Sequence, residues 1–270
     1  MTPEPIAALA VDDARRLVDD ERDHIDEKLA AFDRFADGLR RLPTDSPSPS
    51  PRSTTVGAGP PGSISAAAGG RSAGDDTTRQ VRSLFAETVR PYSIEDVDEP
   101  EPLLVSIREE LTPEIALAVA PSTDRAFTPE LRTAIYAAVD QSQAELRAMR
   151  QGLATEAESL AAAADLRTEL TDWIDARPPC SKQGFEALSR RHERLDDFRQ
   201  QCDALAADRQ STLHGTTNHT ATASLSHQLL VEYLYQPLAV DYPVLSAVAR
   251  LTDYCESRRR TVRRHLTRRA

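Results

Sequence analysis

The sequence predicts an all-α protein: a long antiparallel coiled-coil-like helical hairpin, with shorter packing helices and a tethered N-terminal amphipathic helix. Three observations predict this class. Apolar side chains recur at heptad spacing over several long segments, prolines bound those segments, and aromatic residues make up only 5% of the chain. A core built mainly from Leu, Val, Ile and Ala suits packed helices better than a β-sandwich.

The first predicted element is an amphipathic helix within residues 1–42. Its opposite face is rich in aspartate, so one stripe is expected to be buried and the other solvated. Such a stripe requires a partner helix, either in this chain or in another copy. The apolar side chains that recur every seven residues are Val11, Val18, Ile25, Phe32 and Leu39.

Residues 43–76 are rich in Pro, Ser, Gly and Ala and nearly devoid of large apolar side chains. Because they offer too little apolar surface to offset the entropy of ordering, we expect a disordered linker. Gly57, Gly59 and Gly62 have the spacing of a dinucleotide-binding fingerprint. However, no strand precedes them, and the two prolines after Gly59 lack the backbone N–H groups that a phosphate needs.

The third predicted region, residues 77–270, is a helical domain. Thr128 before Pro129 is a strong helix start, and Ser181 is the expected cap of a second long helix. Together these helices form the hairpin, over about residues 129–214, and two apolar helices after it are expected to pack on it. The hairpin side chains at heptad spacing are Val139, Leu146, Leu153, Leu160, Leu188, Leu195 and Cys202.

The charge balance predicts a halophilic protein. The chain carries 43 acidic against 33 basic residues, a net charge of −10, and Lys28 and Lys182 are its only lysines. A carboxylate-rich surface holds water and cations in molar salt, and arginine keeps a weakly hydrated planar cation there. The alternative explanation of this composition is a GC-rich genome, in which codons for Arg, Asp and Ala are frequent.

Neither a membrane span nor a secretory signal is predicted. No stretch approaches the roughly 18 apolar residues that a bilayer requires, and the amino terminus lacks a basic region before its short apolar run. The expected location is therefore the cytoplasm. Cys180, Cys202 and Cys255 are widely spaced without a CxxC pair, which indicates neither a disulfide framework nor a zinc site.

Catalytic motifs are weak throughout the sequence. His192 begins the string HERLD, which resembles the start of a zinc-protease motif, but Asp196 stands where the second histidine belongs. His214, His219 and His227 fall in and around one loop and are expected to be solvated. With no serine elbow, phosphate-binding loop or Cys/His pairing, we expect no cofactor, no metal and no enzymatic activity.

The strongest local feature is an Arg-rich C-terminal helix. Its guanidinium groups either contact nucleic acid or an acidic protein, or they offset the helix dipole and neutralise acids of the same chain. Because phosphate affinity falls steeply with salt, pairing within the chain or with a protein is favoured over nucleic acid. The candidate contact residues are Arg258, Arg259, Arg260, Arg263, Arg264, Arg268 and Arg269.

Four strings carry a resemblance to a known family: RSLFAETVRPY, FTPELRTAI, SKQGFEALSRRHERLDDF and LLVEYLYQPLAVDYPVLSAVARL. They resemble a haloarchaeal helical family known as a domain of unknown function, over roughly residues 79–265. The resemblance supports the halophilic and all-α predictions and transfers no catalytic residue.

Two hypotheses for function follow. The first is a non-catalytic helical interaction or scaffold protein, which binds protein, either itself or another chain, through its apolar helix seams. The alternative is a nucleic-acid-associated regulator that uses the arginine-rich helix. No interaction with a membrane is expected.

Overall fold

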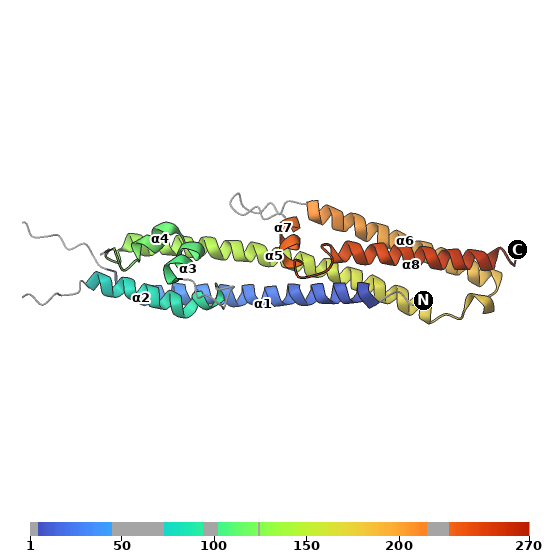
Figure 1. Ribbon diagram of the computed structural model, residues 1–270, viewed down its shortest axis with the longest axis horizontal. Helices are drawn as coiled ribbons and strands as arrows, with labels where there is room; N and C mark the ends of the chain where they lie inside the picture. Colours follow the sequence, from blue (N-terminus) through green and yellow to red (C-terminus); the bar gives the residue numbers. More distant parts are fainter. Residues whose placement is uncertain (1–4, 45–72, 94–101, 124, 215–226, 270) are drawn as a thin grey trace, which may run out of the picture. The chain divides into compact units, whose positions relative to one another are not determined.

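The computed structural model describes residues 5–44, 73–93, 102–123, 125–214 and 227–269 (Figure 1). Over these ranges the chain forms α-helices and short 3₁₀ helices and contains no strand, which confirms the all-α class. Nor does any helix in these ranges combine the length and apolarity needed to cross a membrane. The α-helices are α1 (Pro5–Arg41), α2 (Ala73–Thr88), α3 (Leu103–Glu110), α4 (Pro113–Ala118), α5 (Pro129–Asp175), α6 (Phe185–His214), α7 (His227–Leu234) and α8 (Pro243–Leu266).

Contacts divide the chain into two units, which are described separately. Unit 1 comprises Met1–Asp23 and Arg147–Ala270, and unit 2 comprises His24–Leu146. The long helices α1 and α5 each contribute residues to both units.

Helix α1 covers most of the predicted amphipathic segment. All five heptad side chains, from Val11 to Leu39, are at most 1% exposed, so the apolar stripe is buried against this same chain. Of the predicted linker, residues 45–72 lie outside the described ranges. Helix α2 begins at Ala73, so the end of the predicted linker is helical. Its first turn is polar and gives no apolar signal, and there Asp76 accepts a hydrogen bond from Gln80.

Unit 2 has an apolar, aromatic core. The rings of Phe35 on α1 and Phe85 on α2 meet edge to face, with centroids 5.6 Å apart. The two helices approach closely at Gly38, where an added Cβ would overlap the side chain of Leu84. The buried core side chains include Phe32, Phe35, Phe85, Val89, Ile107, Val119, Phe127, Ile135 and Val139.

Two helix starts of unit 2 follow the expected capping chemistry. The Thr112 hydroxyl accepts a hydrogen bond from the Ile115 N–H, 3.2 Å away, and α4 begins at Pro113. The Thr128 hydroxyl likewise accepts from the Leu131 N–H at 3.3 Å, and α5 begins at Pro129 as predicted. Each threonine satisfies a backbone donor that the first helical turn leaves unpaired.

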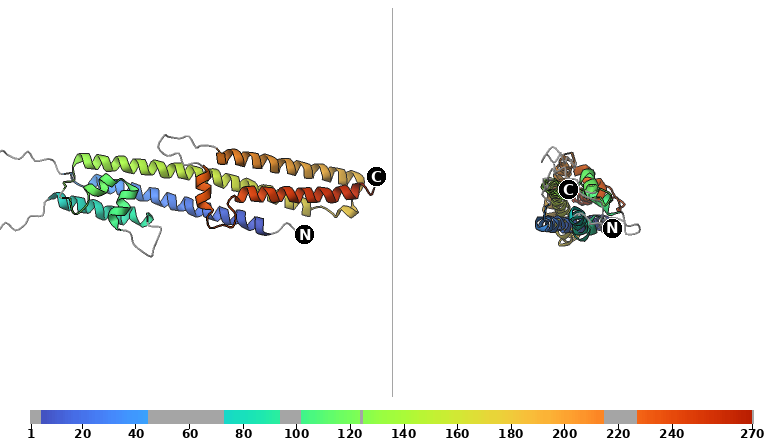
Figure 2. Two further views of the ribbon diagram at one scale, coloured as in Figure 1. Left: turned by 45° about the horizontal axis from the view of Figure 1, so that its top comes forward. Right: turned by 90° about the vertical axis from the view of Figure 1, so that its left-hand side faces the viewer.

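In unit 1, α6 lies beside α8 along its length (Figures 1 and 2). The helices are antiparallel, because Asp196 near the middle of α6 pairs with Arg259, while Arg269 beyond the end of α8 reaches Ser181, ahead of α6. The short helix α7 precedes α8 and runs across the direction of α6 and α8.

The part of α5 in unit 1 also runs antiparallel to α6. Glu169 pairs with Arg194 at 2.7 Å, whereas the earlier residue Glu156 pairs with the later Arg209. Whether this hairpin packs as a coiled coil stays a prediction. The expected cap at Ser181 is wrong: residues Cys180–Lys182 form a 3₁₀ turn, and α6 begins at Phe185.

Candidate functional site

Several of the seven candidate arginines, which lie in α8 or directly after it, bind their own chain. Arg259 is 3.0 Å from Asp196 on α6, with its side chain 19% exposed. Arg258 donates to the Tyr254 hydroxyl and lies over the Tyr254 ring. Arg269 donates to the Ser181 carbonyl at 2.7 Å and also to that of Gln183. The contacts of Arg259 and Arg269 tie the start and the end of the arginine-rich segment to α6 and to the turn before it.

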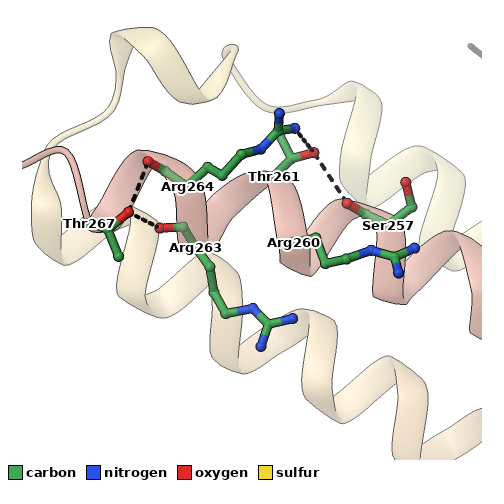
Figure 3. Close-up of a pocket in the computed structure, with 6 residues that line it drawn as sticks. All are labelled: Ser257, Arg260, Thr261, Arg263, Arg264 and Thr267. Carbon is green, nitrogen blue, oxygen red and sulfur yellow. Dashed lines mark hydrogen bonds between the residues drawn. The ribbon is translucent and has the colours of Figure 1, made fainter.

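Three other arginines, Arg260, Arg263 and Arg264, are exposed and line a shallow open concavity of about 520 Å³. Figure 3 shows the guanidinium of Arg264 bent back over Thr261, while that of Arg263 points away from α8. Residues three and four positions apart share a helix face. The other lining residues carry hydroxyl groups: Ser257, Thr261 and Thr267.

No ion pair within the described residues involves Arg260, Arg263 or Arg264. Arg268, also exposed, follows one turn after Arg264. Because Cys255 and Val262 of α8 are buried, the rotation of the helix is fixed with these arginines toward solvent. We call Arg260, Arg263 and Arg264, together with the three hydroxyl residues, the basic face of α8.

Arginines of α8 lower the pKa values of two residues on α6. Burial lowers the pKa of His192, and the charges of Arg259 and Arg263 lower it further, against the opposing effect of Asp196. His192 is therefore neutral at neutral pH. The hydrogen bond from Arg199 lowers the pKa of the Asp196 carboxyl, against the opposing effect of burial, and Arg259 lowers it further. His192 and Asp196, the first and last residues of the HERLD string, thus lie at the contact between α6 and α8. No group of metal ligands forms within the described ranges.

Sequence reasoning missed a second cluster in unit 1, which is buried and charged. Glu156 on α5 and Arg209 on α6 are 0% and 1% exposed and form a two-pronged ion pair, with Nη1–Oε2 and Nη2–Oε1 distances of 2.6 and 2.8 Å. His227 of α7 donates from Nε2 to Oε2 at 2.9 Å, and the Tyr235 hydroxyl donates to Oε1 at 2.5 Å. We call these four residues the buried charge cluster.

The buried charge cluster holds one ionised carboxylate. Burial raises the pKa of Glu156, but the hydrogen bond from His227 and the charge of Arg209 outweigh it, so the pKa lies below its ordinary value. Burial and the charge of Glu156 raise the pKa of Tyr235, which keeps the phenol protonated as a donor. Both carboxylate oxygens are occupied by donors of this chain. This chemistry pins α5, α6 and α7 together.

A known protein family covers most of the chain. A family model described as a domain of unknown function (DUF7260) matches residues 9–259. The chain belongs to this family. Comparisons with curated proteins and with solved structures find no match.

The DUF7260 match begins in α1, far before the expected start of the resemblance near residue 79, so it includes the amino-terminal helix. It contains the whole buried charge cluster. It ends within α8 at Arg259, directly before the first arginine of the basic face.

One expectation about the histidines of this DUF7260 protein is wrong. His227 is not solvated but 3% exposed, because Glu156 gives its ring a buried partner. His214 is exposed and contacts the Gln210 carbonyl, and His219 lies outside the described residues.

One signal in the sequence pointed to the buried charge cluster. Leu188, Leu195 and Cys202 follow a seven-residue spacing, and the next position in that series is Arg209. A charged residue on an otherwise apolar seam needs a buried partner of opposite charge. Its partner Glu156 lies three residues after the seam residue Leu153, although the spacing alone does not select it among the acids of α5.

Proposed function

We propose that this DUF7260 protein is a non-catalytic helical interaction protein, whose basic face on α8 binds an acidic segment of a partner protein. The observation that carries the proposal is the division of the α8 arginines. Arg259 and Arg269 bind the protein's own α6 region, whereas Arg260, Arg263 and Arg264 face solvent around an open concavity. Arginine with adjacent hydroxyl groups is suited to binding carboxylates.

The size and surroundings of the basic face favour a short acidic segment over a nucleic acid. Helix α6, which packs against α8, exposes Glu193, Asp197 and Asp203. A nucleic acid that extended beyond α8 would bring its phosphates against these carboxylates, and the chain carries a net charge of −10. A peptide with a few carboxylates needs only the basic face.

The buried charge cluster supports a non-catalytic role. Glu156 has the acid–base chemistry of a catalytic group, but its oxygens accept from Arg209, His227 and Tyr235 at 2.5 to 2.9 Å. With Glu156 fully buried, those donors occupy the positions that a substrate would need.

The proposal includes a halophilic archaeal cytoplasm, which the acidic, lysine-poor composition supports. Molar salt screens the repulsion among surface carboxylates, whereas at about 0.1 M the Debye length of about 10 Å lets them repel their neighbours. Circular dichroism during a KCl titration tests this: helical signal is expected to fall as KCl decreases from about 1 M to 0.1 M. Unchanged helicity would contradict the halophilic part of the proposal.

Fluorescence anisotropy with a labelled glutamate-rich peptide and a labelled short DNA duplex tests the binding function. The triple variant Arg260→Gln, Arg263→Gln, Arg264→Gln is compared with Arg15→Gln, Arg125→Gln, Arg250→Gln, which changes net charge equally at exposed arginines elsewhere. We expect the first variant to bind the peptide about tenfold more weakly than wild type, and the second to bind it like wild type.

Two results would contradict the proposal. Equal peptide affinity in the two triple variants would show that the peptide senses only net charge. A duplex complex that persists at about 1 M KCl and requires the basic face would favour the nucleic-acid alternative, because phosphate contacts alone are lost at that salt concentration.

A further inference from the structure

Two cysteines face one another inside unit 1. Cys202 on α6 and Cys255 on α8 are both fully buried, on two helices that pack against each other. The antiparallel register places them together, since Asp196 and Arg259, a short distance away on the same two helices, form an ion pair of 3.0 Å. Both thiols are free.

The two thiols are not equivalent. The hydrogen bond from Cys255 lowers the pKa of Cys202, although burial opposes it. The same hydrogen bond and burial raise the pKa of Cys255. A lower pKa favours the thiolate, so we assign Cys202 the role of the attacking thiol.

We propose that Cys202 and Cys255 form a redox-active dithiol that a small hydroperoxide oxidises to a disulfide between α6 and α8. The inference is independent of the proposed binding function. A small oxidant is required because neither side chain is exposed to a protein-sized thiol–disulfide exchange partner.

The reaction balances in two steps. The Cys202 thiolate attacks one oxygen of hydrogen peroxide, the O–O bond breaks, and hydroxide leaves, so that Cys202 becomes a sulfenic acid. Cys255 then attacks the Cys202 sulfur as the S–O bond breaks, and its proton leaves with the oxygen in water. Overall, two thiols and one peroxide give one disulfide and two waters.

The position of the disulfide gives oxidation a structural consequence. Arg209, His227 and Tyr235, three of the four residues of the buried charge cluster, lie in the sequence between Cys202 and Cys255. A disulfide would close this segment into a loop and restrict its unfolded state. Oxidation would thereby hold α7 on α5 and α6 more firmly.

The third cysteine provides an internal control. Cys180 lies on the 3₁₀ turn between α5 and α6 and is partly exposed. It is the expected site of direct attack by a bulky alkylating reagent. Cys202 and Cys255 should resist that reagent in the folded protein and yet disappear together on treatment with peroxide.

The experiment treats the full-length protein with hydrogen peroxide and follows it by mass spectrometry and thermal melting. We expect the loss of two hydrogens, a cross-link between the peptides containing Cys202 and Cys255, and a melting temperature raised by about 5 to 10 °C, reversible with dithiothreitol. Cys180→Ser should behave like wild type. Cys202→Ser and Cys255→Ser should form no internal cross-link and show no rise.

Three outcomes would overturn the proposal. These are retention of both buried thiols by the folded wild-type protein, sulfinic acid at either cysteine in place of the cross-link, or a disulfide that involves Cys180. Cys202→Ala provides a second variant if the serine hydroxyl is tolerated poorly in the core. Since the basic-face variants retain all three cysteines, failure here leaves the peptide-binding test unaffected.

Discussion

Both units have an apolar core, but among the described residues a fully buried ion pair occurs only in unit 1. In unit 2, helices meet through phenylalanine and aliphatic side chains, with the edge-to-face contact of Phe35 and Phe85 near its centre. In unit 1, a fully buried ion pair between Glu156 and Arg209 lies where α5, α6 and α7 meet. Unit 1 also has an edge-to-face aromatic contact, between Trp173 and Phe198, so the buried charge is what distinguishes it.

The difference concerns how narrowly each core specifies its packing. Apolar contacts are non-directional, so a core such as that of unit 2 tolerates changes of shape. A buried ion pair that loses one partner leaves an uncompensated charge, which strongly penalises every alternative arrangement. In unit 1, Glu156 accepts from Arg209 of α6 and from His227 of α7, and we infer that the cluster specifies the place of α7.

The largest expected effect comes from neutralising Glu156. Glu156→Gln keeps the shape of the side chain but leaves Arg209 buried without a counter-ion, which should reduce the free energy of unfolding by about 3 to 5 kcal/mol. The matched change in unit 2 is Glu110→Gln, whose partner Lys28 lies 2.7 Å away in a partly exposed pair. Its cost should be about 1 kcal/mol or less. Denaturant titration measures both, and equal costs would remove the distinction between the units.

The next largest effect is expected in how the stabilities of wild type and Glu156→Gln depend on pH. The pKa of Glu156 is lowered in the folded state, so its ionised form contributes stability above its ordinary value of 4.5. That contribution is lost as the pH falls below 4.5 and through the folded pKa. Thermal melts from neutral pH to acid should therefore converge for wild type and Glu156→Gln. A gap that stays constant across this range would mean that Glu156 stabilises the fold in some other way.

A smaller effect is expected from reshaping the core of unit 2. Phe85→Leu keeps an apolar side chain but removes the edge-to-face partner of Phe35. The expected loss is about 1 to 2 kcal/mol, since the aromatic pair and some packed volume disappear while no charge is stranded. Calorimetry should rank this variant as more stable than Glu156→Gln. The reverse order would show that the aromatic core is the more specific of the two.

The smallest effects should come from two glycines at helix crossings. A Cβ at Gly38 would overlap several atoms of the Leu84 side chain, whereas one at Gly152 would meet only Leu230 Cδ2, at 2.8 Å. Alanine improves helix propensity by about 1 kcal/mol at both sites, and overpacking opposes it by about 1 to 3 kcal/mol. Gly38→Ala should therefore destabilise the protein more than Gly152→Ala. Equal melting temperatures of the two variants would contradict this order. They would indicate that Leu84 makes room for a Cβ as readily as Leu230 does.

Much of the fold could be predicted because its signals are local. Heptad spacing identified the buried side chains of α1, and Thr128 marked a helix start through a cap three residues before a backbone donor. The start of α2 was missed because its first turn is polar. The 3₁₀ turn at Cys180–Lys182 stands in place of the expected cap, and Arg269, from a distant part of the chain, binds carbonyls of that region, a contact that no local pattern shows.

The candidate sites show the same limit. The arginine cluster was visible as a run of charge, but only tertiary contacts separate Arg259, which binds Asp196, from Arg260, which faces solvent. The buried charge cluster joins residues 53 to 79 positions apart from Glu156. No local pattern connects such residues, although Arg209 on an apolar seam marked one member.

Amide hydrogen exchange of wild type and Glu156→Gln, read separately over α7 and over α2, tests most directly whether the buried charge cluster holds α7 in place. The account predicts protection of the His227–Leu234 amides in wild type and its loss, by about tenfold or more, in the variant. Protection of α2 in unit 2 should be unchanged. Unaltered protection of α7, or an equal loss over α7 and α2, would contradict the claim.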